Sequence, residues 1–413
     1  MTSAGPPHEK KVTGLVAAVG SRASGSRRVT LVLSVLAMSF GGALACGRTG
    51  LELLDDVGND GVASGYEAGE ARGADAAPDA LPGSGSLPPS CAPGGPGMTN
   101  CGPGGSGGES CCASLEVPGG TYYRTYSNSG NGPTGEANPA TVSGFRLDKY
   151  LVTVGRFRQF VDAVMPSDAG PGGYAPEAGS GKHTYLNGGL GLANVGDEAF
   201  DGGDAGMPYE PGWIASDDSN VAPTNDNLAC GLGLQTWTDS AASNETLPIN
   251  CVNWWESYAF CIWDGGFLPS EAEWEYATAG GSQEREFPWG SASPAMSDLY
   301  AIYNNGYYDG YPLVAPVGTA TLGAARWGQL DMVGELWEWN LDATKTYVQY
   351  VDPCINCSYL PPPPPFDLVY SRVANGYYVP YTESQASPGA PYCPDSYPPS
   401  TRLNVGFRCA RAP

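Results

Sequence analysis

Residues 26–46 set the compartment in which this chain folds, and with it the chemistry open to its cysteines. They read SRRVTLVLSVLAMSFGGALAC, a basic pair, an apolar core too short to span a bilayer comfortably, and then small residues. This pattern is typical of a signal peptide, so we expect residues 1–45 to be a signal peptide whose n-region, the stretch before the apolar core, is longer than usual. The chain's cysteines then fold in an oxidising compartment, where disulfides are favoured over metal or redox sites.

Cys46 directly follows Ala43-Leu44-Ala45, a sequence that resembles the lipobox of bacterial lipoproteins. We therefore predict that Cys46 is lipidated and that the mature chain is anchored to a membrane of the cell envelope, at its periplasmic or outer-membrane face. The alternative is cleavage by an ordinary signal peptidase, which would leave Cys46 as a plain thiol.

The segment 46–110 that follows contains little that could form a core. Its composition is represented by GADAAPDALPGSGSLPPSCAPGGPG, and such a sequence predicts a flexible tether in front of a folded domain at 111–413. The formal net charge of the whole chain is −23. This charge excludes nucleic acid as a partner bound through phosphate neutralisation, and it favours solubility or divalent cations.

Glycine and proline interrupt the folded part so often that long helices are excluded, because the chain holds 59 Gly and 37 Pro. Helical patterns nevertheless occur at 154–164, at 254–266 and from Ser270, which can cap the third helix, to Gly280, which can end it. Aromatic and β-branched residues predict strands at 117–126 and 140–153. The expected fold is therefore α+β and loop-rich, with two or three short helices and little regular secondary structure.

Several longer motifs then occur in order between about residues 111 and 411. They are GFRLDKYLVTVGRFRQFVDA, LPINCVNWWESYAFCIWDGGFLPSEAEWEYATAGG, FPWG, DMVGELWEW and GFRCAR. Together they resemble the sulfatase-modifying factor family, also known as the formylglycine-generating enzyme family. The resemblance implies a C-type-lectin-like fold, in which we expect Trp274 and Tyr276 to be core residues.

The resemblance and the spacing of the cysteines suggest three disulfides in the domain. The candidate pairs are Cys261–Cys409, which the resemblance implies, and Cys230–Cys251 and Cys354–Cys357, which are close in sequence. For the third pair the alternative is a CxxC metal or redox site, which export disfavours. Four cysteines at positions 91, 101, 111 and 112 can staple the tether to the domain. Removing Cys46 leaves an odd number, and Cys393 is the candidate for an unpaired thiol.

A catalytic member of the family would need ligands for a redox metal. Formylglycine-generating enzymes bind copper with two nearby thiolates shortly before the closing GFR motif, but here that segment holds Cys393 and the structural Cys409 without a close second cysteine. A related branch resembles iron-dependent sulfoxide synthases and needs several imidazoles. His183 is the only histidine after the signal peptide, and in its loop we expect it to be structural. We therefore expect neither copper nor iron.

Calcium is the cofactor that the resemblance still allows. Two segments are similar to calcium loops of the family, NNGYYDGY with Asn304, Asp309 and Tyr311, and GELWEW with Glu335 and Glu338. Glu335 stands where the family usually has asparagine, which would alter the geometry of that site. The alternative for Asp309 is an ordinary solvated turn.

The tyrosines Tyr377, Tyr378 and Tyr381 lie where a thiolate would be required, and they are our candidate binding residues. Packing of long loops is the competing interpretation. The leading hypothesis is an exported, lipid-anchored, non-catalytic binding or structural module for an unknown protein or glycan ligand. The alternative is a metal-dependent oxidase acting on protein or small-molecule thiols with a ligand set we do not recognise, so enzymatic activity stays open. A third hypothesis is a maturation partner for another exported enzyme.

Overall fold

The computed structural model describes residues 88–91, 101–102, 108–166, 173–194, 208–230, 235–293, 297–302, 314–344, 352–360, 371–375 and 395–413, with the backbone alone at 344, 371–375 and 395–397. The chain divides into two compact units, Met1–Asp56 and Val57–Pro413, and every described residue belongs to the second. Within these ranges no helix is long and apolar enough to cross a membrane. The predicted signal peptide and Cys46 lie outside the described residues.

Three helices form where the sequence predicts them, and shorter helical turns lie before, between and after them in the described chain. The helices are α1 (Val154–Val164), α4 (Trp254–Trp263) and α5 (Glu271–Ala279), with α3 (Asn225–Leu228) and the 3-10 turns η1 (Pro89–Cys91), η3 (Asn187–Gly189), η4 (Ala215–Asn220) and η5 (Gly281–Gln283).

Local capping explains where α4 and α5 begin and end. Asn253 and Ser270 each accept a hydrogen bond from the third backbone N–H of their helix, and Glu256 and Glu273 at those positions accept one from the cap residue in return. Gly280 ends α5 in the left-handed region at φ 69°, a conformation that disfavours other residues. Both helix starts are therefore fixed by residues within four positions in the chain.

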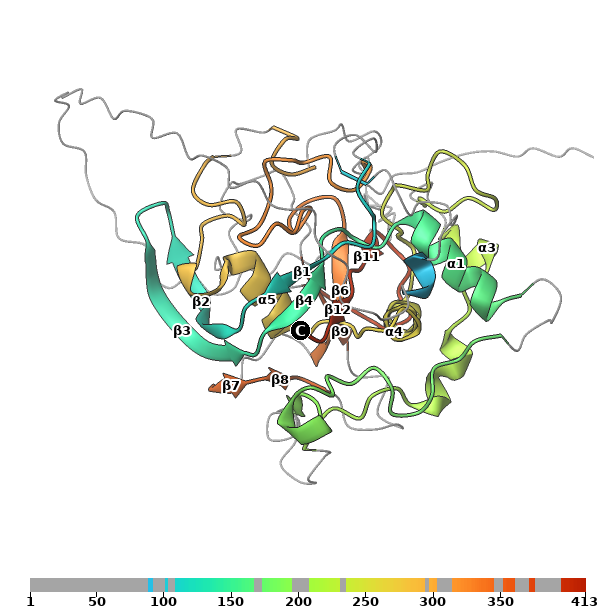
Figure 1. The fold of residues 1–413 in the computed structure, drawn as a ribbon, viewed down its shortest axis with the longest axis horizontal. Coiled ribbons are helices and arrows are strands. Elements are labelled where there is room, and N and C mark those ends of the chain that lie inside the picture. Colours follow the sequence, from blue (N-terminus) through green and yellow to red (C-terminus); the bar gives the residue numbers. More distant parts are fainter. Residues whose placement is uncertain are drawn as a thin grey trace, which may run out of the picture. The chain divides into compact units, whose positions relative to one another are not determined.

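Most of the strands are short, and the described strands form four small sheets (Figure 1). The sheets are β1–β4–β12, β10–β9–β6–β11, β2–β3–β7 and β5–β8, from strands β1 (Ser114–Val117), β2 (Gly120–Asn128), β3 (Pro133–Val142), β4 (Phe145–Asp148), β5 (Ala193–Asn194), β6 (Trp337–Thr344), β7 (Cys354–Ile355), β8 (Cys357–Ser358), β9 (Ser371–Asn375), β10 (Asp395–Tyr397), β11 (Val405–Gly406) and β12 (Ala410–Arg411). Helices α4 and α5 both contact β6. This arrangement confirms the α+β, loop-rich fold.

Each of the two strands predicted near the start of the domain is divided in two by a change of sheet. The stretch 117–126 passes from β1 to β2 through Gly119, and 140–153 passes from β3 to β4 through Gly144. The two crossings lie against each other, since a Cβ on Gly119 would stand 2.6 Å from the backbone nitrogen of Gly144. Propensity alone does not reveal the break, because the residues on both sides favour strands.

The core is aromatic, as a fold with few helices requires. Phe157 of α1, Phe260 of α4 and Phe407 contact one another with ring centroids 5.3–6.2 Å apart. Trp274 and Tyr276 of α5 are both buried in a second cluster. The sequence expectation for these two residues, core rather than ligand-facing, agrees with their placement.

Five disulfides fix the loops to this core. The pairs are Cys91–Cys112, Cys101–Cys111, Cys230–Cys251, Cys261–Cys409 and Cys354–Cys357. The last three are the pairs expected from the sequence. The five bonds use ten of the twelve cysteines, and the other two, Cys46 and Cys393, lie outside the described residues.

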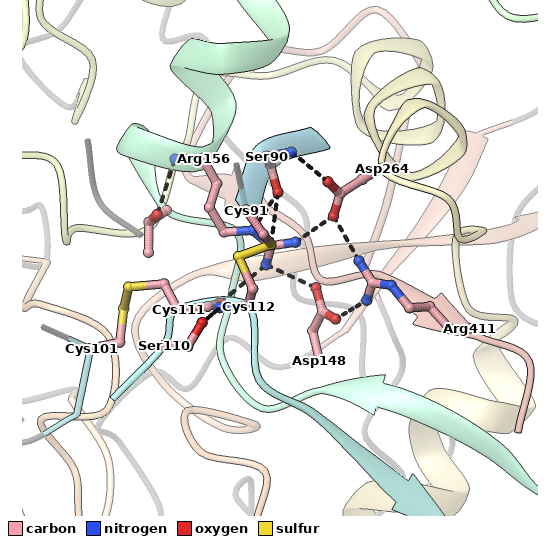
Figure 2. Close-up of a disulfide and its surroundings, with 11 residues drawn as sticks. Ser90, Cys91, Cys101, Ser110, Cys111, Cys112, Asp148, Arg156, Asp264 and Arg411 are labelled. Atoms are coloured by element: carbon pink, nitrogen blue, oxygen red, sulfur yellow. Dashed lines mark hydrogen bonds and ion pairs between the residues drawn. A yellow bond between two sulfur atoms is a disulfide. The ribbon is translucent and has the colours of Figure 1, made fainter. Parts of the chain in front are cut away.

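The packed part of the chain includes a clip that the sequence places in the tether. Within 46–110, η1 packs against α1, and its Ser90 is fully buried. The Ser90 backbone N–H donates to Asp264 (3.0 Å), and Ser90 Oγ accepts from Arg156 Nε (3.0 Å). The staple suggested by the cysteines at 91, 101, 111 and 112 is therefore present, and disulfide Cys91–Cys112 holds η1 of the low-complexity segment on the domain (Figure 2).

Arg156 lies at the centre of a buried ionic network at the base of this clip (Figure 2). Its guanidinium pairs with Asp148 (2.9 Å) and Asp264 (2.7 Å), and none of the three side chains is exposed. Arg411 pairs with the same two aspartates from the other side, 2.7 Å from Asp264. Two arginines thus balance two aspartates, which is the condition under which buried charges are tolerated. Burial would lower the pKa of Arg156, but the two aspartates raise it above its ordinary value.

Removing the clip disulfide Cys91–Cys112 is expected to cost more stability than removing the disulfide Cys354–Cys357, which closes a much shorter loop. Cys91–Cys112 closes a separation of 21 residues and Cys354–Cys357 one of 3. Loop-closure entropy then predicts about 3 kcal/mol for the first pair and about 1.5 kcal/mol for the second. Urea unfolding of the two double serine variants measures the difference. Equal losses of stability in the two variants would show that contacts other than the Cys91–Cys112 disulfide hold the clip on the domain.

Candidate functional site

The sheet β10–β9–β6–β11 carries the segment in which the resemblance places the family's thiolates. Ala374 of β9 lies opposite Trp339 of β6 on one side and opposite Asp395 of β10 on the other. The connection 376–394 therefore leaves and returns at one point of this sheet. The candidate binding residues Tyr377, Tyr378 and Tyr381, together with Cys393, belong to this connection and lie outside the described residues.

The disulfides decide how many thiols remain for a metal. Every cysteine of the described residues is oxidised. Cys46 and Cys393 are then the two cysteines left in the sequence, separated by nearly the whole chain. Copper bound by a close pair of thiolates needs two cysteines near the GFR motif. Among the described residues, no cysteine is left with a free thiol for that ligand set.

Glu338 of β6, a predicted calcium ligand, has both carboxylate oxygens bonded within the protein. Arg408 donates to Oε2 from Nε (2.7 Å) and to Oε1 from Nη2 (2.8 Å), and Trp274 Nε1 donates to Oε2 (3.1 Å). All three side chains are buried. Glu338 therefore acts as the counter-ion of Arg408, and its geometry does not present a free oxygen to an ion.

Glu335, the other described calcium candidate, has a different environment. Its Oε1 accepts from the backbone N–H of Ala315 (3.0 Å), while Oε2 is buried without a hydrogen-bond partner. Nearby Asp331 repeats the pattern, with Oδ2 accepting from Gly318 N–H (2.6 Å) and Oδ1 unpartnered. Burial and then Asp331 raise the pKa of Glu335 well above its usual range, and burial raises that of Asp331 to about 6.

These two orphaned oxygens fit a hard cation, because calcium binds carboxylate oxygens and would compensate their burial. Glu335 also contacts the chain just before the other predicted calcium loop, NNGYYDGY. Its backbone N–H donates to the carbonyl oxygen of Ile302 (2.8 Å), two residues before Asn304. Asn304, Asp309 and Tyr311 themselves lie outside the described residues. Among the described residues no group of three or more His, Cys, Asp or Glu is arranged to hold a metal.

His183 joins the long loop region to α5. Its Nδ1 lies 3.0 Å from Glu210 Oε1 and its Nε2 lies 3.0 Å from Glu273 Oε2. The imidazole is fully buried. Burial would lower its pKa, but the two glutamates raise it to about 10. This pKa favours the protonated ring at neutral pH, and with both nitrogens engaged by carboxylates His183 forms a structural bridge between the loop region and α5.

A second group of buried acids surrounds the same helix. Asp342 of β6 accepts from the backbone N–H groups of Glu271 and Tyr359, both at 2.7 Å. Burial and then Glu271 raise the pKa of Asp342 to about 7 and that of Glu275 well above its usual range. The ionised form of Glu275 is disfavoured because burial removes its water and the like charge of Glu271 lies one helical turn away, although Arg124 acts in the opposite direction.

Sequence reasoning did not find these clusters as sites. Glu271 and Glu273 lie in the first turn of α5, where acidic residues are also favoured by the helix dipole alone. A usable signal was nevertheless present: the carboxylates of Glu271 and Glu275 are spaced i, i+4 in EAEWEYATA, among residues that the same analysis assigns to the core. Like charges at that spacing on a buried helix predict a shared proton or a cation.

The family comparison covers most of the domain. A family model described as sulfatase-modifying factor enzyme 1-like domain matches residues 105–413. Formylglycine-generating enzyme of Mus musculus is 27% identical over 219 residues, 50% of this chain and 51% of that protein. That match therefore spans about half the length of the mouse enzyme.

A second mouse relative is more similar in sequence. Inactive C-alpha-formylglycine-generating enzyme 2 of Mus musculus is 35% identical over 247 residues, 55% of this chain and 68% of that protein. Among solved structures, PvdO from Pseudomonas aeruginosa is similar at 19% identity with a TM-score of 0.41, covering 73% of this chain and 94% of that one.

Proposed function

Because this chain belongs to the sulfatase-modifying factor family, we propose that it is a non-catalytic member, an exported and lipid-anchored binding or structural module of the cell envelope. One observation carries this proposal. Five disulfides consume ten cysteines, and lipidation of Cys46 would leave Cys393 as the one remaining thiol. A single thiol cannot supply the thiolate pair that copper-dependent oxidation needs. The similarity to a relative named inactive points the same way.

The binding surface of the module is the connection between β9 and β10. Its ends are held together at Ala374, and it contains Tyr377, Tyr378 and Tyr381. Tyrosine-rich loops held on a rigid sheet supply contact area at low entropic cost, which suits recognition of a protein or a glycan. The buried clusters around α5 and β6 serve this module as scaffold.

Calcium is part of the proposal as a structural ion. The unpartnered oxygens of Glu335 and Asp331, together with the predicted ligands Asn304, Asp309 and Tyr311, would hold it. Once bound, the cation would neutralise two buried carboxylates whose raised pKa values report the cost of burying them.

The competing function is a metal-dependent oxidase, favoured by the relatives named formylglycine-generating enzyme. It would need a ligand set built from Cys393 and residues other than the disulfide-bonded cysteines. Such a centre would be single-thiolate, unlike the pair that the family resemblance implies.

The test uses the full chain exported through an oxidising compartment and loaded with copper, iron and calcium in turn. Elemental mass spectrometry is expected to find calcium but no stoichiometric copper or iron. Alkylation of the denatured, unreduced protein is expected to modify one cysteine, Cys393, with Cys46 carrying lipid in the intact mass. Stoichiometric copper or iron would overturn the non-catalytic proposal. Two modified cysteines and no lipid would overturn the anchor.

A further inference from the structure

The loop that joins β2 to β3 contains an asparagine followed by a glycine at its tip. β2 ends at Asn128, β3 begins at Pro133, and the residues between them read SGNG. Asn131 and Gly132 are both exposed, and Gly132 takes a positive φ of 98°. Asparagine before glycine is the dipeptide in which attack of the backbone nitrogen on the side-chain amide is least hindered, because glycine has no Cβ to shield that nitrogen.

The groups that would react at this tip are not held by the fold. Neither the Asn131 side chain nor the Gly132 backbone N–H has a hydrogen-bond partner among the described residues. A Cβ placed on Gly132 would meet no atom within 4 Å, so the space around its backbone is open. The Gly130 N–H donates to Asn128 Oδ1 (3.0 Å), a bond that fixes the start of the loop and leaves the peptide between Asn131 and Gly132 free to turn.

A second asparagine–glycine pair of the described chain, Asn187–Gly188 in η3, is also exposed but is held in place. Asn187 Nδ2 donates to the carbonyl oxygen of Gly191 (2.7 Å). Backbone hydrogen bonds close the same turn, from Gly191 N–H to Leu186 O (3.3 Å) and from Leu190 N–H to Asn187 O (3.4 Å). Cyclisation at Asn187 would first have to break the side-chain bond. The two sites thus share dipeptide and exposure but differ in the freedom of the amide.

We propose that Asn131 is a site of spontaneous deamidation, which converts it to aspartate and isoaspartate. The Gly132 nitrogen gives its proton to water and bonds to Cγ of Asn131, the Cγ–Nδ2 bond breaks, and ammonia leaves. Water then opens the resulting succinimide ring. Cleavage of the bond between the Gly132 nitrogen and Cγ gives aspartate, whereas cleavage of its bond to the main-chain carbonyl carbon gives isoaspartate. Water is the only co-reactant, and no group is oxidised or reduced.

Deamidation changes both the charge and the backbone of this loop. A carboxylate replaces the neutral amide next to Gly130, where a Cβ would stand 3.3 Å from Glu286 Oε2. Like charges at this end of the hairpin repel one another. In isoaspartate the main chain also runs through the former side-chain carbon. The modification needs neither the lipid anchor nor the binding surface, so it goes beyond the proposed function.

The test incubates the full chain, with its disulfides intact, at pH 8 and follows each asparagine by peptide mapping with mass spectrometry. Exchange of the amide NH₂ for OH marks deamidation, and chromatography separates aspartate from isoaspartate. Asn131 is expected to react about tenfold faster than Asn187, because Asn187 must first lose the hydrogen bond to Gly191. Mapping assigns each site separately, so the asparagine–glycine pairs at 305–306 and 375–376 do not affect the result.

Two controls show whether the fold causes the difference. In the reduced and denatured chain, Asn131 and Asn187 are expected to react at similar rates, because both precede glycine. Asn131→Gln is expected to abolish the product in the β2–β3 loop, since the longer side chain would have to form a larger ring, and an exposed loop residue tolerates this change. Equal rates at Asn131 and Asn187 in the folded chain would overturn the proposal. It would also fail if Asn131 reacted in the denatured chain and not in the folded one.

Discussion

Replacing Arg156 with methionine is expected to destabilise the domain by about 3–5 kcal/mol, a large fraction of the stability of an ordinary domain. The substitution leaves Asp148 and Asp264 buried with one arginine between them, because Arg411 alone then faces both carboxylates. It also removes the donor that holds Ser90 of the N-terminal clip. Urea unfolding with the disulfides intact, followed by tryptophan fluorescence, measures the change in free energy.

The matched control is Lys149→Met, in which the pair broken is near the surface. Lys149 Nζ lies 2.8 Å from Glu109, and the side chains keep exposed fractions of 21% and 40%. Pairs of this kind contribute about 0–1 kcal/mol, because water solvates both partners after the change. Similar small losses for both variants would contradict the interpretation of Arg156 as the centre of a buried network.

Local features of this fold could be predicted from the sequence, whereas pairings between distant residues could not. Helices α4 and α5 were predictable because their caps, Asn253 with Glu256 and Ser270 with Glu273, lie three residues apart. The pairing of Arg156 with Asp264 was not, since these two residues lie 108 positions apart in the chain. Residue type alone gives the number of charges and their spacing, but not which of them meet in a fold made largely of loops.

In the candidate site, too, the local motifs were predictable and the contacts between them were not. The resemblance suggested which segment corresponds to the family's thiolates, and the backbone pairing of β9 with β6 and β10 locates the two ends of the connection to which it belongs. Glu338 was expected to bind calcium because its motif resembles a calcium loop. In the structure, both oxygens of Glu338 accept hydrogen bonds from Arg408, a residue of the closing GFR motif. No local pattern connects those two motifs, so that pairing could not be anticipated.

His183 carries the second large effect, and it acts through pH. The His183→Phe variant is expected to lose about 3–5 kcal/mol at pH 7, because Glu210 and Glu273 would stay buried without the cation between them. Phenylalanine fills a similar volume beside Phe267, whose ring centroid lies 3.8 Å from that of His183, so the loss reports charge more than packing.

In the wild-type protein the same contact predicts alkaline destabilisation. The pKa of His183 is raised from 6.5 to about 10, so its contribution is fully present below pH 6.5 and is lost as the pH rises toward 10. One proton bound by the folded state and not by the unfolded state changes stability by about 1.4 kcal/mol per pH unit, or about 2–3 kcal/mol between pH 7 and 9. The raised pKa of Asp342 also makes the protein less stable as the pH rises, but over a lower range. The stability contributed by its bound proton is lost between about pH 4 and the folded-state pKa of about 7.

Urea unfolding at half-unit steps from pH 6 to 9 distinguishes the two groups. The wild-type free energy of unfolding is expected to fall steadily above pH 7, and the His183→Phe curve is expected to be flat there. His183 is the only histidine after the predicted signal peptide, so its imidazole gives a single set of NMR signals in the mature chain. Those signals should remain those of the protonated ring at pH 8. A ring that titrates near pH 6.5, together with parallel stability curves, would show that the two glutamates do not hold it as a cation.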